Sequence, residues 1–211
     1  MNDARQLIQR KWPEALCSTT DDSELVFSTG FPDLDTLFPL FGIPYGQLIE
    51  VTGGISSGKT SLLLRLLAQW TKSRMVCYVD FSDSFFPDAA ISSGVNLNRL
   101  MVIKPETNST GYLKTGIRTV ELLQRGQTVG IIVFDLVGQH NLLPISLLHR
   151  LRLKTVRSKG LVVFLTQSNS HIIPSSMASL RLEVRRSGDG LEITVTKSRI
   201  STEGSQVEVR L

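Results

Sequence analysis

The sequence is poor in the features that mark secreted, metal-binding and membrane proteins. Its 211 residues include only two cysteines, Cys17 and Cys77, and three histidines. Two thiols cannot build a disulfide framework, and neither residue type has the spacing of a metal site. No apolar run approaches the roughly 18 residues that a membrane span needs. The opening residues, MNDARQLIQRKW, lack the apolar stretch of a secretion signal. These absences predict a cytoplasmic protein without membrane contact.

The charge balance is only slightly basic, with 23 lysines and arginines against 19 aspartates and glutamates. The resulting net charge of +4 permits contact with nucleic-acid phosphates but does not require it. An ordinary solvated surface explains the same composition, so both interpretations stay open. Hydrophobic residues make up 41% of the chain, which is enough for a domain with a sizeable core.

Strand and helix patterns alternate through most of the chain. Helical patterns cover residues 59–72, 111–125 and 142–159, and apolar strand candidates lie at 48–53, 75–81, 100–105, 130–135 and 160–167. Strands that are apolar throughout and separated by helices are typical of a parallel sheet covered on both faces. We therefore predict an α/β domain with a mostly parallel, twisted sheet flanked by helices.

The pattern changes at both ends of the chain. Three C-terminal segments alternate apolar and polar residues, with turn signals at Ser187–Gly190 and Thr202–Ser205, which predicts an antiparallel meander at one sheet edge. At the other end, Ala4–Trp12 is an amphipathic helix candidate followed by a polar stretch. We therefore divide the chain into an N-terminal helix and linker, 1–29, and a core, 30–211.

A glycine-rich segment between the 48–53 strand and the 59–72 helix matches G-x-x-x-x-G-K-[ST] at every fixed position. Its glycines would let main-chain N–H groups close around phosphates, and the helix N-terminus adds a favourable partial charge. Lys59 would contact the β and γ phosphates of ATP, and the Thr60 hydroxyl would bind Mg²⁺. A chance Gly/Ser turn is the alternative, but the flanking strand and helix argue against it. The predicted nucleotide-binding residues are Gly53, Gly54, Ile55, Ser56, Ser57, Gly58, Lys59, Thr60 and Ser61.

A carboxylate is expected beside this loop, because Mg²⁺ keeps water ligands that need orienting. The apolar run Ile131–Phe134 ends at Asp135, which is the metal-binding and catalytic candidate. Asp80 follows the apolar residues of the 75–81 strand candidate in the same way, and we interpret it as a structural acid.

Several other segments resemble motifs of the RecA recombinase family and follow one another in the family's order, so the sequence is similar to that family over residues 27–200. The segments that carry this resemblance are Phe27–Gly30, Leu34–Asp35, Gly42–Glu50, Gly94–Leu100, Lys104–Thr107, Leu161–Gln167, Ser179–Arg186 and Val195–Ile200. The resemblance implies a RecA-like P-loop NTPase core that binds ATP and Mg²⁺ in the bacterial cytoplasm or nucleoid.

The resemblance also assigns roles to single residues. Gln167 matches the glutamine that senses the γ-phosphate, which makes it a catalytic candidate with Lys59 and Asp135. Lys197 and Arg199 match two basic residues that reach the phosphates of a neighbouring subunit and stabilise charge there. Two solvated charges on an edge strand are the alternative for this pair.

Several features depart from the family pattern. Ser82 occupies the position of the catalytic glutamate, and a serine cannot take a proton from water at neutral pH. Asp83, one residue later, could substitute as the base, although the shift re-aims its side chain, so we predict weak hydrolysis. Ala89 replaces an adenine-stacking tyrosine. The loops 136–143 and 168–179 are shorter than the two DNA-contacting loops of the family, whose C-terminal domain has no counterpart before Leu211.

These departures match an accessory branch better than a recombinase. In these departures the sequence resembles ImuA, the RecA-like component of the bacterial translesion-synthesis mutasome, which acts with polymerase subunits. This resemblance implies an ATP-binding accessory protein of DNA repair and the SOS response that couples nucleotide state to assembly with such partners. The alternative is an active DNA-dependent ATPase that forms filaments on single-stranded DNA, which Gln167, Lys197 and Arg199 favour.

An N-terminal motif is a candidate for self-association. Trp12 and Ala15 form an aromatic-x-x-Ala pattern that resembles the polymerisation motif of archaeal and eukaryotic recombinases. The alternative is a helix end packed on its own core, with Pro13 stopping the helix.

A basic helix face is the candidate for nucleic acid. Arg150, Lys154 and Arg157 share one face of the 142–159 helix and could contact phosphates, although a solvated exterior is an equal interpretation. His171 is expected in a loop near the nucleic acid.

Overall fold

The computed structural model describes residues 26–106, 115–118, 120, 129–140, 142–170 and 172–211. Its α-helices are α2 (Pro32–Asp35), α3 (Lys59–Trp70), α4 (Pro87–Ser92) and α6 (Ile145–Arg157). Its strands are β1 (Val26–Phe27), β2 (Ile43–Pro44), β3 (Gln47–Gly53), β4 (Val76–Asp80), β5 (Leu100–Ile103), β6 (Ile131–Asp135), β7 (Leu161–Leu165), β8 (Leu180–Ser187), β9 (Gly190–Ser198) and β10 (Gln206–Arg210). A short 3-10 turn at Leu97–Arg99 precedes β5.

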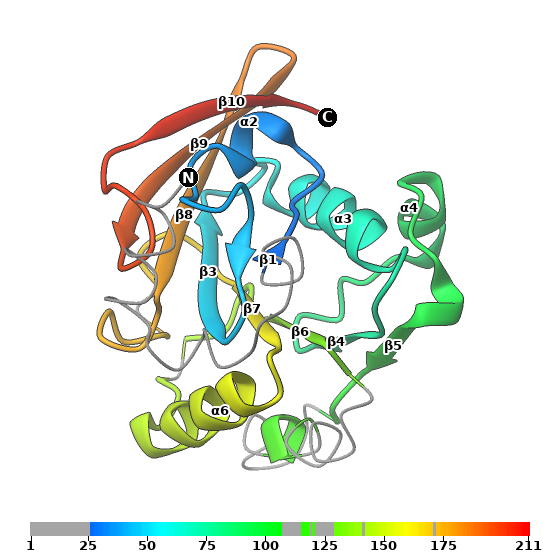
Figure 1. Cartoon of the computed structure of the whole chain (residues 1–211). Coiled ribbons are helices and arrows are strands. Elements are labelled where there is room, and N and C mark those ends of the chain that lie inside the picture. Colours follow the sequence, from blue (N-terminus) through cyan, green and yellow to red (C-terminus); the bar gives the residue numbers. More distant parts are fainter. Residues whose placement is uncertain (1–25, 107–114, 119, 121–128, 141, 171) are drawn as a thin grey trace.

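Eight of these strands form one sheet in the order β10-β9-β8-β3-β7-β6-β4-β5 (Figure 1). From β8 to β5 every neighbouring pair is parallel, whereas β9 pairs antiparallel with β8 on one side and with β10 on the other. All residues of β3, β4, β6 and β7 are buried, which is why β7, and β4 and β6 up to their final aspartates, are apolar without alternation. The predicted α/β domain with a mostly parallel sheet is therefore confirmed.

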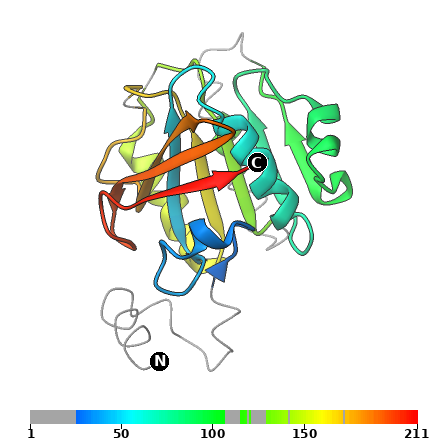
Figure 2. The same ribbon diagram turned by 90° about the horizontal axis from the view of Figure 1, so that it is seen from above.

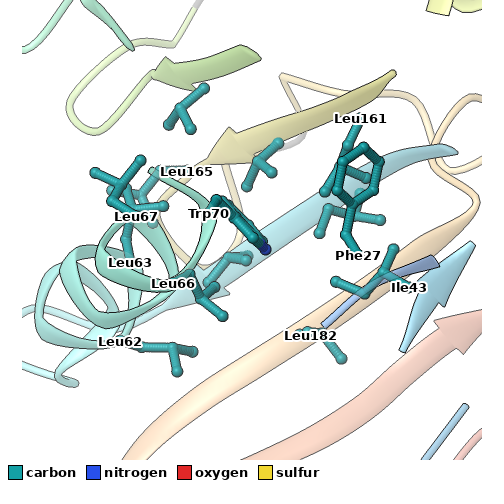
Figure 3. Packing of buried hydrophobic residues seen from close by; sticks show 14 of the residues in the cluster. Phe27, Ile43, Leu62, Leu63, Leu66, Leu67, Trp70, Leu161, Leu165 and Leu182 are labelled. Carbon is teal, nitrogen blue, oxygen red and sulfur yellow. The ribbon is translucent and has the colours of Figure 1, made fainter. Parts of the chain in front are cut away.

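The two faces of the sheet carry separate apolar cores, because successive side chains of a strand point in opposite directions. Ile131 and Val133 of β6 pack with α3, whereas Ile132 and Phe134 pack with α6. The two helices accordingly lie on opposite sides of the strands (Figures 1 and 2). Figure 3 shows the α3 side, where leucines of the helix and Trp70 lie against the strands.

The segment before β2 is bonded to the core. Phe27 is buried and its ring lies 4.6 Å from that of Tyr45, in an edge-on arrangement. The Trp70 indole N–H donates to the Ser28 carbonyl oxygen at 2.9 Å. Residues 1–25, with the helix predicted at Ala4–Trp12, lie outside the described residues, and the division at residue 29 stays a prediction.

The predicted 142–159 helix begins later, at Ile145. Pro144 takes the N-cap position, where its missing N–H removes no helical hydrogen bond. Most of the predicted 111–125 helix lies outside the described residues, and Thr115–Arg118 are helical. No helix among the described residues is long and apolar enough to cross a membrane.

Candidate functional site

The candidate site lies where the parallel strands end. In an open α/β sheet, ligands bind outside the carboxyl ends of the strands. Gly53 ends β3, and Asp80 and Asp135 end β4 and β6 as direct register partners. Gln167 follows β7 by two residues. Parallel pairing brings these residues, distant in sequence, to one edge of the sheet.

The turn Gly53–Thr60 connects β3 to α3 in a tight main-chain curve. Ser56 and Gly58 both have a positive φ, of 57° and 88°. A Cβ on Gly53 would lie 2.4 Å from Ser57 Oγ and 2.6 Å from the Val184 carbonyl oxygen, so only glycine fits there. The Ser57 hydroxyl is buried and, within the described part of the chain, has no hydrogen-bond partner. Within the described residues, the turn therefore leaves the Ser57 hydroxyl available to a ligand.

Lys59 is the buried cation of this turn. Its Nζ donates to the Gly54 carbonyl oxygen at 2.8 Å, across the top of the loop. Burial lowers the pKa of Lys59, and the Asp135 carboxylate opposes that shift through its charge. Gly58, the N-cap of α3, offers no side chain to the first N–H groups of the helix. The loop thus combines an ammonium with helix N–H donors, as an anion site requires.

The Asp135 carboxylate is held in one orientation by three donors. Tyr78 donates its hydroxyl to Oδ2 at 2.7 Å, Ser84 donates to the same oxygen at 2.9 Å, and the Val137 N–H donates to Oδ1 at 3.1 Å. Burial and the neighbouring Asp135 carboxylate raise the pKa of Tyr78 far above its usual value, so its hydroxyl keeps the proton. The three donors therefore fix the orientation of the Asp135 carboxylate beside the Lys59 loop.

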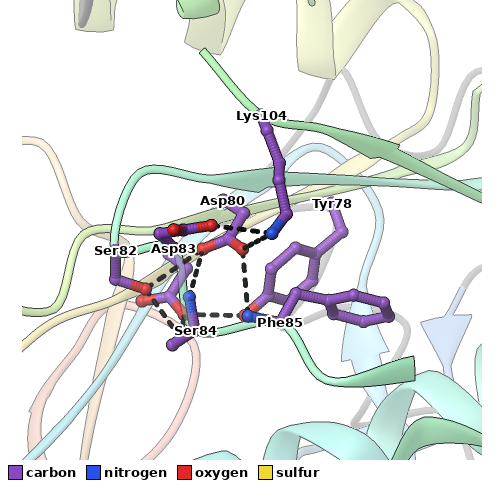
Figure 4. A network of polar contacts seen from close by, with 8 residues as sticks. Tyr78, Asp80, Ser82, Asp83, Ser84, Phe85 and Lys104 are labelled. Atoms are coloured by element: carbon purple, nitrogen blue, oxygen red, sulfur yellow. Dashed lines mark hydrogen bonds and ion pairs between the residues drawn. The ribbon is translucent and has the colours of Figure 1, made fainter. Parts of the chain in front are cut away.

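Asp80 closes the turn that follows β4 (Figure 4). Its carboxylate accepts the N–H groups of Ser84 and Phe85 at 3.1 and 2.9 Å, and the Ser82 hydroxyl at 3.2 Å. All these contacts satisfy backbone and turn groups. Its geometry is that of a structural acid, as the sequence led us to expect.

Asp83 extends from the same turn in a left-handed conformation, with φ of 52°. Its Oδ1 lies 2.7 Å from the Nζ of Lys104, the residue that follows β5. The hydrogen bond from Lys104 lowers the pKa of Asp83, and the ammonium charge adds to the shift. Asp83 is therefore paired with a cation on the neighbouring strand end.

Gln167 borders a small pocket of about 160 Å³, which Glu50 and Arg181 also line. Glu50 is buried in β3 and accepts the Arg181 Nε–H at 2.7 Å and the Thr166 hydroxyl at 2.8 Å. This ion pair ties β8 to the β3 strand that leads into the Gly53–Thr60 turn.

The two basic residues of the β9 end bind their own chain. Lys197 donates to the Ala178 carbonyl oxygen, and Arg199 donates to the Ser176 carbonyl oxygen. Burial lowers the pKa of Lys197, and the charges of Arg199 and Arg181 act in the same direction. Whether these cations reach a neighbouring subunit stays a prediction.

The other predicted contact residues lie apart from this edge or outside the described residues. Arg150 and Arg157 are exposed and Lys154 is half-buried on α6, on the opposite face of the sheet from α3. Trp12, Ala15 and His171 lie outside the described residues.

Sequence reasoning missed Tyr78, Ser84 and Lys104. A tyrosine inside an apolar strand signals a buried hydroxyl that needs a partner. Lys104 follows a strand candidate, so the shared edge of a parallel sheet could have placed it near Asp80.

These residues fit a Mg²⁺-bound nucleotide. Lys59, the loop amides and the α3 N-terminus are donors for phosphate. The Ser57 hydroxyl, which has no partner among the residues that the structure describes, adds a further polar group. The exposed Thr60 hydroxyl and the Asp135 carboxylate are oxygen ligands of the kind that Mg²⁺ prefers. No cluster of three or more His, Cys, Asp or Glu forms a separate metal site in the described residues.

The fold and this edge define the class: an α/β domain whose candidate site lies at the carboxyl ends of parallel strands. The family model for the RecA N-terminal domain matches residues 14–149, more than half of the chain. The chain therefore belongs to the RecA N-terminal domain family.

Curated relatives agree with this assignment. The RecA protein of Paramagnetospirillum magneticum is 29% identical over 219 aligned positions, covering 88% of this chain and 58% of the relative. The RecA protein of Pseudomonas fluorescens is 28% identical over 216 aligned positions, covering 85% of this chain and 60% of the relative. The chain thus spans less than two thirds of the length of these relatives.

Proposed function

We propose that this chain binds Mg²⁺-ATP on the Gly53–Thr60 turn and acts as a RecA-like accessory protein of DNA repair. The observation that carries the proposal is the Gly53–Thr60 turn, which holds buried Lys59 at the N-terminus of α3, at the same strand edge where three donors orient the Asp135 carboxylate. Lys59 and the loop amides would bind the phosphates, and Thr60 and Asp135 would hold the metal ion. When bound, Mg²⁺ supplies charge that stabilises the transferring phosphoryl group.

Hydrolysis should be slow, because the residues near Asp135 offer a poor general base. Ser82 occupies the position at which the RecA family has its catalytic glutamate, and its hydroxyl is hydrogen-bonded to Asp80 and Ser84. Asp83 is paired with Lys104. Slow hydrolysis would keep the protein in the ATP-bound state for long periods. Such a state suits assembly with partners, in the manner of ImuA and its polymerase subunits, better than rapid cycling.

Lys59→Ala is expected to weaken Mg²⁺-ATP binding by at least about tenfold, or 1.4 kcal/mol, because it removes the ammonium of the turn. Isothermal titration calorimetry measures the effect. Lys72→Ala is the matched control, since Lys72 lies just beyond the other end of α3 and its Nζ bonds only Gln69 among the contacts that the structure gives it. Equal affinity of the Lys59→Ala protein and the wild type would remove the proposed nucleotide site.

An active DNA-dependent ATPase and recombinase is the second candidate. The similarity to RecA proteins over 85–88% of this chain supports it, as do Gln167, Lys197 and Arg199. Steady-state ATP turnover with and without single-stranded DNA distinguishes the two functions. Slow turnover with little stimulation fits the accessory protein, whereas strong stimulation and filaments in electron micrographs fit the recombinase.

DNA contact through α6 is compatible with both the accessory protein and the recombinase. Its face of Arg150, Lys154 and Arg157 would bind phosphates without sequence preference, so binding should weaken as salt rises. Binding of single-stranded DNA that is unchanged in an Arg150→Gln/Arg157→Gln variant would exclude this face.

A further inference from the structure

Lys104 stands out because its ammonium lies between two carboxylates at the proposed catalytic edge. Its Nζ lies 2.7 Å from Asp83 Oδ1 and 3.9 Å from Asp80 Oδ2 (Figure 4). The Asp80 side chain is fully buried, whereas those of Lys104 and Asp83 are 54% and 80% exposed. Asp80 is already committed to backbone donors. The Lys104 hydrogen bond therefore acts on Asp83, the exposed carboxylate.

The turn that carries Asp83 is anchored on both sides. Asp80 accepts the N–H groups of Ser84 and Phe85, and the Ser84 hydroxyl donates to Asp135 at 2.9 Å. Asp83 is thus fixed one residue from a side chain that contacts the proposed metal ligand. Its carboxylate points toward β5, where Lys104 holds it.

We propose that Lys104 is a positioning residue that restrains Asp83 and thereby keeps ATP hydrolysis slow. This inference rests on the proposed function. In hydrolysis the oxygen of water bonds to the γ-phosphorus, and the P–O bond to ADP breaks with its electron pair left on ADP. The proton of that water must pass to a base. While Asp83 is paired with the ammonium, its carboxylate is both turned away and a weaker acceptor for that proton.

The size of the effect follows from the exposure of the pair. Exposed ion pairs are weak in water, so the restrained form is favoured only modestly over the released one. Removing the ammonium should raise kcat about twofold to fivefold, and should leave KM for Mg²⁺-ATP nearly unchanged. A merely structural role of Lys104 would instead lower stability and kcat together.

The test compares steady-state ATP turnover of Lys104→Gln, Lys104→Arg and the wild type, with nucleotide affinity measured by calorimetry. We expect a faster Lys104→Gln protein and a Lys104→Arg protein close to wild type, because arginine restores the ion pair. Adding Asp83→Asn to Lys104→Gln should cancel the gain. Lys72→Gln is the control, since Lys72 is exposed and its Nζ donates to an amide, Gln69, rather than to a carboxylate.

Three outcomes would overturn the inference. An unchanged kcat in Lys104→Gln with intact nucleotide affinity would mean that the pair does not restrain catalysis. A lower kcat would indicate that Lys104 itself stabilises the transferring phosphoryl group. A gain that persists in the double variant would exclude Asp83 as the base. Absence of nucleotide binding in the wild type is a different result, because it removes the proposed function and this inference with it.

Discussion

Gly53→Ala is expected to destabilise the domain by about 2–3 kcal/mol and to abolish nucleotide binding. An added Cβ would lie 2.4 Å from Ser57 Oγ and 2.6 Å from the Val184 carbonyl oxygen. The serine could change rotamer, but the carbonyl oxygen belongs to β8, which pairs with β3 in the sheet. The end of β3 and the turn must therefore move away from β8. The main-chain N–H groups of the turn then no longer point toward a common centre where a phosphate could bind.

Gly54→Ala is the matched control, because no heavy atom lies within 4 Å of a Cβ built there. Its stability should change by less than about 0.5 kcal/mol, as is usual for an exposed position. Urea unfolding measures both variants, and calorimetry with Mg²⁺-ATP measures binding. Equal losses in the two proteins would contradict the steric argument. A further variant, Gly53→Ala/Ser57→Ala, should recover little stability, because the contact with Val184 remains.

Strand ends were predictable from sequence, but the contacts between them were not. The apolar runs before Asp80 and Asp135 are local patterns that predict buried parallel strands, and the described strands lie at those runs. The Tyr78 hydroxyl reaches Asp135 across 57 positions because β4 and β6 are neighbours, with Asp80 opposite Asp135. Strand order follows from the packing of the whole sheet, and no local pattern records it.

The same reason explains Asp83. From sequence, a carboxylate one residue beyond the expected position is a plausible base, and nothing local opposes that interpretation. The structure adds Lys104, which directly follows β5, the strand that pairs with β4 at the sheet edge. Side-chain direction in a turn depends on φ, and the left-handed conformation of Asp83 is set by hydrogen bonds to Asp80 that link residues four and five positions apart.

Arg181→Leu is expected to cost about 3 kcal/mol in the free energy of unfolding, because it leaves the Glu50 carboxylate buried without its cation. The Glu50 side chain is only 4% exposed, and Arg181 is the cation paired with it, at 2.7 Å. Glu50 would keep the Thr166 hydroxyl, which is too weak a partner for a charge in that position. Urea unfolding measures the loss.

The control lies on the same strand. Arg185 pairs with Glu183 at 3.1 Å, but the two side chains are 67% and 26% exposed. Water solvates both partners after Arg185→Leu, so this change should cost less than about 1 kcal/mol. Similar losses for the two arginines would show that burial of the Glu50–Arg181 pair is unimportant for stability.

Replacing both Glu50 and Arg181 distinguishes the cost of leaving one charge unpaired from the loss of the connection that the ion pair makes. Glu50→Leu/Arg181→Leu should be more stable than Arg181→Leu alone, because no unpaired charge remains buried. The guanidinium also lies near the Ile173 carbonyl oxygen, at 3.4 Å, and so connects β3 to the segment that follows Gln167. The double variant would therefore regain stability while losing that connection. Limited proteolysis with and without Mg²⁺-ATP tests the connection: protection of residues 168–179 in the wild type but not in the double variant would indicate that the ion pair links the turn to this loop.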